Sequence, residues 1–265
     1  MTIIYENDLS DARDLLLRDG TTAEVVEWQG RRALKLNGLA VIPAVSLTEG
    51  HIEVQIGAEG AAYPGIAFRV ADMANYELAY AQPHTSELWD AIQYDPVFHG
   101  SNTWQMYYGS SYQQVAQVPT NAWFKFAIDF QDQHAVIRVG DQPPLFVARS
   151  AHAQPGGPIG LWTYLPAYYC DLSVTPLEHD LPSAVGNCPI DPDSIDEWFM
   201  AGFGVITCEP TRILNLNRYF PVALGEVRLT RLIDVLAAGP IELDVGFSDE
   251  LTLQIDNKVI FTGQH

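Results

Sequence analysis

Apolar residues recur at every second position in many short stretches of the chain, with polar residues between them. This period of two is typical of β-strands that bury one face in a sheet. The clearest stretches are Glu24–Trp28, Ala33–Leu36, His51–Ile56, Ile66–Val70, Tyr76–Tyr80, Trp123–Phe130, Ala135–Val139, Ile159–Tyr164 and Tyr168–Val174. Turn residues separate them and helical periodicity is scarce, so the pattern predicts an all-β, two-sheet sandwich.

Two local signals refine this pattern. Phe124, Phe126, Ile128 and Phe130 form a continuous apolar stripe within one stretch. Because side chains of a strand alternate between its two faces, the stripe predicts a face in the core. Asn37-Gly38 lies between two apolar runs and is a strong signal for a two-residue hairpin turn.

The chain changes character over residues 175 to 198. Four prolines with Ser, Gly and Asp between them predict a linker, and Ser194 to Glu197 fit a capping box that would begin a short helix carrying Trp198–Met200. Beyond it, apolar alternation resumes at 227–229, 241–247 and 251–255. We therefore expect a sandwich over 1–176, a linker with a short helix over 177–198, and a smaller β-rich domain over 199–265.

The net charge of the chain limits the classes of partner that it is expected to bind. With 33 Asp and Glu against 14 Lys and Arg, the 265 residues carry a formal charge of −19. Such a field repels phosphate backbones and anionic membrane surfaces, which argues against nucleic acid and lipid partners. Charged residues make up only 18% of the chain, which does not indicate disorder.

The cysteines and the N-terminus bear on the compartment. Three cysteines without paired spacing argue against a disulfide framework. The first residues lack the basic-then-apolar build of a signal peptide, and no apolar run is long enough to span a membrane. The expectation is a cytoplasmic protein, or a secreted one if a leader has been removed.

The central stretch from Tyr63 to Ser111 carries a family resemblance. It contains, in order, GIAFR, YELAY, PHTSELWDAIQYDPVFHG and TWQMYYG. This series resembles the central strands of bacterial laminin-G-like (concanavalin A-like) domains of lectins and glucanases, where a run such as FRG, YYxxYxRPHxSG, DAxQYxPVFNG and WQLYxG is expected. The resemblance covers residues 1 to 176 and implies a concanavalin A-like jelly roll.

The end of the chain carries a second resemblance. The segment GEVRLTRLIDVLAAGPIELDVGFSDELTLQIDNKVIFTG resembles the first half of a galactose-binding-like sandwich. It stops at His265, short of such a domain, which implies an incomplete one. An incomplete sandwich would leave an apolar face or an open strand edge, so we expect this region to dock on the first domain or to form a homodimer.

The fold carries lectins, binding modules and glycosidases alike, so the residues must decide the function. Aromatic rings stack on the apolar face of a sugar, and polar groups bond its hydroxyls. The sequence predicts a glycan or other polar small molecule as the ligand, bound on the central sheet. The candidate ligand-binding residues are Arg69, His84, Asp90, Gln93, Trp104 and Tyr107.

Two other functions stay open. Glu87, Asp90 and Asp95 are candidates for the carboxylate pair of a glycoside hydrolase, in which one carboxyl protonates the leaving oxygen and the other attacks or activates water. A non-catalytic protein-interaction or assembly module is the third reading, and a flat apolar patch would favour it.

Metal sites receive weak support from the sequence. Asp191, Asp193, Asp196 and Glu197 cluster as in a calcium loop, although they do not follow the EF-hand spacing. Acidic residues also gather where a helix begins. We expect no cofactor, with calcium at this cluster as the open alternative.

Overall fold

The computed structural model describes residues 3–152, 154–182, 194–220, 225–235, 237–240 and 242–264. The chain forms two compact units. The first comprises Met1–Cys188 together with Asn217–Ala223, and the second comprises Pro189–Leu216 together with Leu224–His265.

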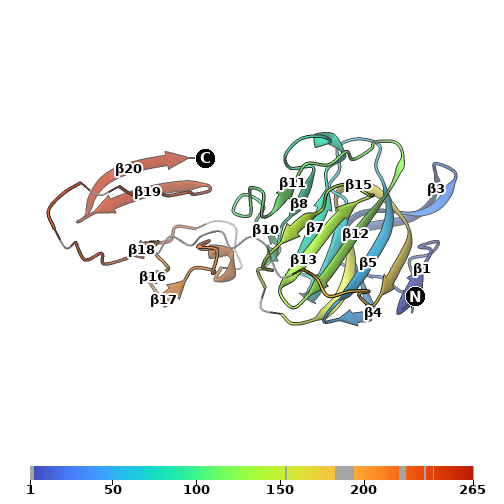
Figure 1. The fold of residues 1–265 in the computed structure, drawn as a ribbon, viewed down its shortest axis with the longest axis horizontal. Coiled ribbons are helices and arrows are strands. Elements are labelled where there is room, and N and C mark those ends of the chain that lie inside the picture. The colour runs from blue at the N-terminus through green and yellow to red at the C-terminus, as the bar shows by residue number, and fades with distance from the viewer. Residues whose placement is uncertain are drawn as a thin grey trace. The chain divides into compact units, whose positions relative to one another are not determined.

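The first unit is an all-β sandwich (Figure 1). Its strands are β1 (Tyr5–Asn7), β2 (Leu16–Leu17), β3 (Thr22–Trp28), β4 (Arg31–Leu47), β5 (Gly50–Gly57), β6 (Gly65–Asp72), β7 (Asn75–Ala81), β8 (Ile92–Tyr94), β9 (Val97–Phe98), β10 (Ser101–Asn102), β11 (Gln113–Gln114), β12 (Trp123–Gln131), β13 (His134–Val139), β14 (Leu145–Val147) and β15 (Gly157–Thr175). A 3₁₀ turn, η1 (Pro83–Thr85), follows β7. The prediction of an all-β sandwich is confirmed.

Two long strands take part in both sheets. One sheet runs β11-β8-β7-β6, then the first half of β15, the second half of β4, and β2. The other runs β3, the first half of β4, the second half of β15, and β5-β12-β13-β14. In Figure 1, β5, β12 and β13 lie side by side in this second sheet. The register of β15 shifts between Thr163 and Ala167, where the strand passes from one sheet to the other.

The core lies between the two sheets. The predicted stripe is buried throughout, with Phe126, Ile128 and Phe130 fully enclosed on β12. The Phe130 ring meets Phe68 of β6 in the other sheet at a centroid distance of 5.2 Å. The period of two therefore assigned the core face of β12 correctly, because this strand pairs without a register shift with β5 over 123–130 and with β13 over 126–131.

The first hairpin turn differs from the predicted one. Asn37-Gly38 lies inside β4, and the chain instead turns at Gln29-Gly30, where both residues have positive φ (43° and 73°). Two consecutive positive φ values suit the twist of a tight hairpin. Gly38 has a packing role: a Cβ there would lie 2.4 Å from the Thr21 hydroxyl oxygen.

The second unit contains two small sheets, β16 (Glu197–Met200) with β17 (Gly204–Thr207) and β18 (Leu229–Thr230), and β19 (Glu250–Ile255) with β20 (Lys258–Gln264). A second 3₁₀ turn, η2, spans Leu216–Arg218, and of its residues Asn217 and Arg218 group with the first unit. The helix predicted at Trp198–Met200 is wrong, because these residues pair with β17 and bury Met200. The strand predicted at 241–247 is absent from residues 242–247.

Apolar side chains of the second unit remain at its surface. Phe199, Val205, Val259 and Phe261 are all about half exposed or more, as two-stranded and three-stranded sheets cannot enclose a core of their own. The galactose-binding-like resemblance, the homodimer and the domain boundaries at 176 and 198 stay predictions. Among the described residues, no helix has the length and hydropathy to cross a membrane.

Candidate functional site

The face of the first sheet that points away from the sandwich core carries a second apolar cluster. Phe68 points toward Phe130 in the core, so its neighbour Ala67 points to the opposite face. There it packs in a buried cluster with Leu39, Val41, Val70, Tyr76, Leu78, Tyr80, Val97 and Trp162. This face is therefore filled by the protein's own side chains, and ligand contacts are left to the groups at its margin.

Tyr63 is the centre of that margin. It lies half-buried in the loop before β6, and its ring meets Tyr80 edge-on at 5.8 Å between centroids. The imidazole of His84 lies 4.8 Å from the same ring, and the ring of Tyr164 lies 5.7 Å from it. The Tyr63 amide also donates to the Tyr164 carbonyl oxygen over 3.1 Å, which fixes the two loops together.

Most of this aromatic group is open to solvent. Tyr164 is 62% exposed and His84 is exposed as well. Their positions come from three separate connections: the loop before β6, η1 after β7, and the bend within β15. We call Tyr63, His84, Asp90, Trp104 and Tyr164 the rim surface.

Asp90 contributes an unsatisfied carboxylate oxygen to the rim surface. Its Oδ1 is buried and has no hydrogen-bond partner among the described residues. Its backbone carbonyl accepts a 2.5 Å hydrogen bond from Nε2 of Gln82, which holds the connection in place. Burial raises the pKa of Tyr80 well above its usual value, and the nearby charges of Asp95 and Asp90 raise it further. The charge of Asp90 therefore acts on Tyr80, the tyrosine that Tyr63 meets edge-on.

Asp95 fastens the loop that carries Trp104. Its two carboxylate oxygens accept from the Asn102 side chain and from the Thr103 amide, each over 2.7 Å. The Tyr80 hydroxyl and the Trp104 amide also donate to this carboxyl. Trp104 itself is 49% exposed. Burial raises the pKa of Asp95 to about 7, against the opposing effect of these hydrogen bonds.

The predicted orientation of Arg69 is wrong. Its side chain is only 1% exposed, donates to the Thr48 carbonyl oxygen and lies over the Phe130 ring. Arg69 has a positive φ of 49°, and the register of β6 shifts between Phe68 and Asp72. This bulge places Phe68 and Arg69 against the same core ring and returns Val70 to the face of Ala67, so simple alternation fails.

Gln93 and Tyr107 are also buried rather than available at the surface. The Gln93 amide donates to the Tyr107 carbonyl oxygen over 2.8 Å and accepts from Gln113 over 2.6 Å. The Tyr107 ring packs edge-on against Tyr94 and Tyr112. The segment 103–108 forms a turn between β10 and β11. Of the predicted site residues, His84, Asp90 and Trp104 lie at the rim surface.

The three carboxylates considered for glycoside hydrolysis have different environments. Asp95 is 1% exposed and bonded on both oxygens, so it is closed to a substrate. Glu87 is exposed and accepts a 3.0 Å hydrogen bond from Gln117. Only Asp90 combines a half-buried position with an unpaired oxygen. The structure therefore supplies one carboxylate at the rim surface with the properties of a ligand contact.

Tyr63 and Tyr164 are the rim residues that the sequence did not indicate. They are about 100 residues apart in the chain and meet only because β15 pairs with β6. Their sole local signal is position: Tyr63 directly precedes Pro64 in the loop before β6, and Tyr164 lies two residues before Pro166 at the bend of β15.

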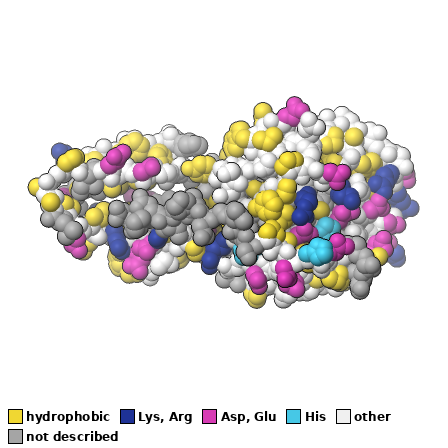
Figure 2. Space-filling model, in the orientation of Figure 1, with side chains coloured by type: hydrophobic (Ala, Val, Ile, Leu, Met, Phe, Trp, Pro, Cys, Tyr) yellow, Lys and Arg dark blue, Asp and Glu magenta, His cyan; other side chains and the backbone are white. Residues whose placement is uncertain are grey.

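The outer face of the second sheet is polar and charged. His51 on β5 lies 2.5 Å from Asp129 on β12, which in turn pairs with Arg138 on β13. The bond to Asp129 raises the pKa of His51. Figure 2 shows acidic, basic and histidine side chains gathered on the part of the surface over these strands. The described residues contain no group of three or more His, Cys, Asp or Glu arranged to hold a metal ion.

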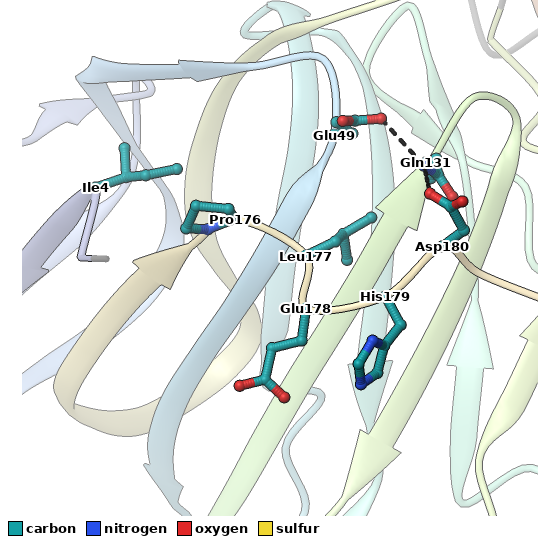
Figure 3. A pocket seen from close by; sticks show the side chains of 8 residues that line it. All are labelled: Ile4, Glu49, Gln131, Pro176, Leu177, Glu178, His179 and Asp180. Atoms are coloured by element: carbon teal, nitrogen blue, oxygen red, sulfur yellow. Dashed lines mark hydrogen bonds between the residues drawn. The ribbon is translucent and has the colours of Figure 1, made fainter. Parts of the chain in front are cut away.

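A cavity of about 490 Å³ lies at one end of this polar face. Figure 3 shows the Gln131 side chain between Glu49 and Asp180, with hydrogen bonds of 3.4 and 3.0 Å to them. Glu178, His179, Ile4, Pro176 and Leu177 complete the wall. None of the residues that line this cavity has a buried polar side-chain atom without a hydrogen-bond partner. We therefore assign the cavity no binding role.

The acidic cluster considered for calcium is only partly within the described residues, since Asp191 and Asp193 lie outside them. Asp196 is paired with Arg212 at 3.2 Å, and Glu197 with Arg231 at 3.3 Å. These two carboxylates therefore serve ion pairs in the second unit. Cys188 also lies outside the described residues, while Cys170 is a buried free thiol in the first unit.

Comparison with known proteins gives the fold. No protein-family model matches the chain, and no curated protein matches it. A Bacillus subtilis protein of unknown function with a galectin-like fold is similar at a TM-score of 0.50 and 10% identity, over 66% of this chain and 96% of its own. The carbohydrate-binding module CBM66 of B. subtilis gives 0.44 at 15% identity (59% and 94% covered), and a Bacillus licheniformis β-glucanase gives 0.44 at 11% (65% and 98%). The first unit thus has the concanavalin A-like architecture that the first of these structures shares.

Proposed function

We propose that the first unit binds a neutral glycan at the rim surface. The observation that carries this proposal is the unpaired Oδ1 of Asp90, which lies in the same connection between β7 and β8 as His84, whose ring meets Tyr63. Exposed tyrosine and tryptophan rings stack on the apolar C–H face of a pyranose. A buried carboxylate oxygen without a donor is costly, and a sugar hydroxyl supplies the missing hydrogen bond.

The charge of the protein supports a neutral or basic ligand. The chain carries a formal charge of −19, and Asp90 and Glu87 lie in the same connection after β7. An acidic sugar would meet repulsion both at long range and at the Asp90 carboxylate. His84 supplies a polar ring nitrogen at the same edge, which suits a second hydroxyl.

The shape of the rim surface also favours a bound chain of sugars over an enclosed small molecule. The face below it is filled by the apolar cluster around Tyr80, and Arg69 and Gln93 are buried, with hydrogen bonds to backbone carbonyl oxygens of the protein. Recognition is then left to the exposed loops. Ligand contacts on loops over a rigid sheet are common in folds of this kind.

A glycan array on the intact protein, followed by titration of the best glycan found, tests the proposal. We expect Tyr164→Ala and Asp90→Asn each to weaken binding about tenfold or more, the loss of one stacking or hydrogen-bonding contact of about 1.4 kcal/mol. Both residues lie at the surface, so the melting temperature should change by only a few degrees.

Phe146→Ala and Asp141→Asn are matched controls, because they remove an exposed ring and an exposed carboxylate from the region of β13 and β14. Their affinities should equal that of the wild type. Failure to bind any glycan on a broad array, or unchanged affinity in both rim variants, would overturn the proposal.

A further inference from the structure

The short segment Asn217–Ala223 groups with the first unit, although Pro189–Leu216 before it and Leu224–His265 after it group with the second. The structure describes this segment from Asn217 to Phe220. The chain thus returns to the first unit between Leu216 and Leu224 and leaves it again. A return of this kind needs contacts that hold it, and the described part of the segment has them.

Arg218 makes the principal contact. Its guanidinium lies over the ring of Phe98 at 4.3 Å from the centroid, and it donates a hydrogen bond to the Ala151 carbonyl oxygen. A planar guanidinium that lies over an aromatic face combines cation–π attraction with stacking. Its N–H groups point outward in the guanidinium plane, so they can donate hydrogen bonds at the same time. Both features are used here.

The surface that Arg218 contacts is held in place by stacking and hydrogen bonds among other residues of the first unit. The His152 ring stacks on Phe98 at 3.9 Å with an interplanar angle of 16°. Its Nε2 lies 2.9 Å from the Val97 carbonyl oxygen, and the His152 amide donates to Glu77 over 2.9 Å. Burial, aided by the charge of Arg218, lowers the pKa of His152 to about 4, so the imidazole is neutral and does not repel the guanidinium.

A second contact fixes the residue before Arg218. Nδ1 of His99 donates to the Asn217 carbonyl oxygen over 2.7 Å. His99 is itself held by a 3.0 Å bond from its amide to the Asn75 side chain, and its φ is positive at 50°. The first unit therefore contacts the backbone of Asn217 and the side chain of Arg218 together.

We propose that Phe98, His99, Ala151 and His152 form a docking surface for an arginine-bearing segment, and that its occupant is this chain's own Asn217–Phe220. The surface selects arginine over lysine, because an ammonium cannot stack flat on Phe98 while bonding the Ala151 carbonyl. The inference is independent of glycan binding. Its consequence is that the first unit includes Asn217–Phe220, a segment remote in sequence from Phe98 and His152.

Limited trypsin digestion of the full-length protein tests the docking. Trypsin must draw an arginine into its own pocket, so a docked Arg218 is protected while the exposed Arg228 of the same chain serves as an internal control. We expect cleavage after residue 218 to be at least tenfold slower than cleavage after Arg228 in the wild type. In Arg218→Lys, the two rates should approach each other.

Phe98→Leu removes the ring from the docking surface and keeps an apolar side chain there. We expect it to accelerate cleavage after Arg218 about fivefold or more, with the rate after Arg228 unchanged as proof that the variant remains folded. If Phe98→Leu unfolds, Arg218→Lys, which leaves the surface intact, still decides. Equal rates at both sites in the wild type, or a ratio that Arg218→Lys leaves unchanged, would overturn the docking surface.

Discussion

Replacing Phe126 by alanine is expected to lower the free energy of unfolding of the first unit by about 3–5 kcal/mol. The ring is fully buried on β12 between β5 and β13, and its removal leaves a cavity in a core shared by both sheets. Urea unfolding followed by tryptophan fluorescence measures the change as a shift of the midpoint at constant slope.

Lys125→Ala on the same strand is the control. Its side chain is 47% exposed and pairs with Glu53 at the surface, so a loss of about 0–1 kcal/mol is expected. A loss below about 1 kcal/mol for Phe126→Ala would contradict the assignment of this face to the core.

The second large effect is a dependence of stability on pH that originates at Asp95. Its pKa is about 7 in the folded protein and near 3.8 in a solvated chain. The folded state therefore holds a proton that the unfolded state releases, and stability falls as the pH rises between about 4 and 7. The fall due to this carboxyl is about 2–4 kcal/mol.

Asp95→Asn isolates this contribution. His51, whose pKa is raised by Asp129, also loses stabilisation as the pH rises, but it does so equally in both proteins. We expect the difference in unfolding free energy between wild type and Asp95→Asn to change by a few kcal/mol from pH 4.5 to pH 8, in favour of the variant at high pH. Parallel pH profiles for the two proteins would show that Asp95 does not titrate in this range.

The features that the sequence predicted are those that depend on uninterrupted strand pairing. Phe124, Phe126, Ile128 and Phe130 alternate with their neighbours within a regular ladder of β12 with β5. In such strands, one residue determines the face of the next. The fold class could therefore be inferred from the pattern together with the resemblance.

The site was less predictable because it depends on departures from that regularity. Arg69 is carried inward by a bulge, and Trp104 is presented by a turn that a buried carboxyl holds. Tyr63 and Tyr164 meet through pairing between distant strands. The capping box at Ser194 is a local signal, and the pairing of Glu197–Met200 with β17 prevailed over it. None of these outcomes can be predicted from the spacing of neighbouring residues in the sequence.

The passage of β4 and β15 through both sheets has a consequence for how the first unit folds. Neither sheet can be completed without β15, whose last residues pair with β1 and with β5. Contacts between ends so far apart in the chain give a high contact order, which slows folding. Since both sheets share the same two strands, they gain and lose their structure together. During synthesis, the N-terminal strands must wait for residue 175 to leave the ribosome before the sandwich can close.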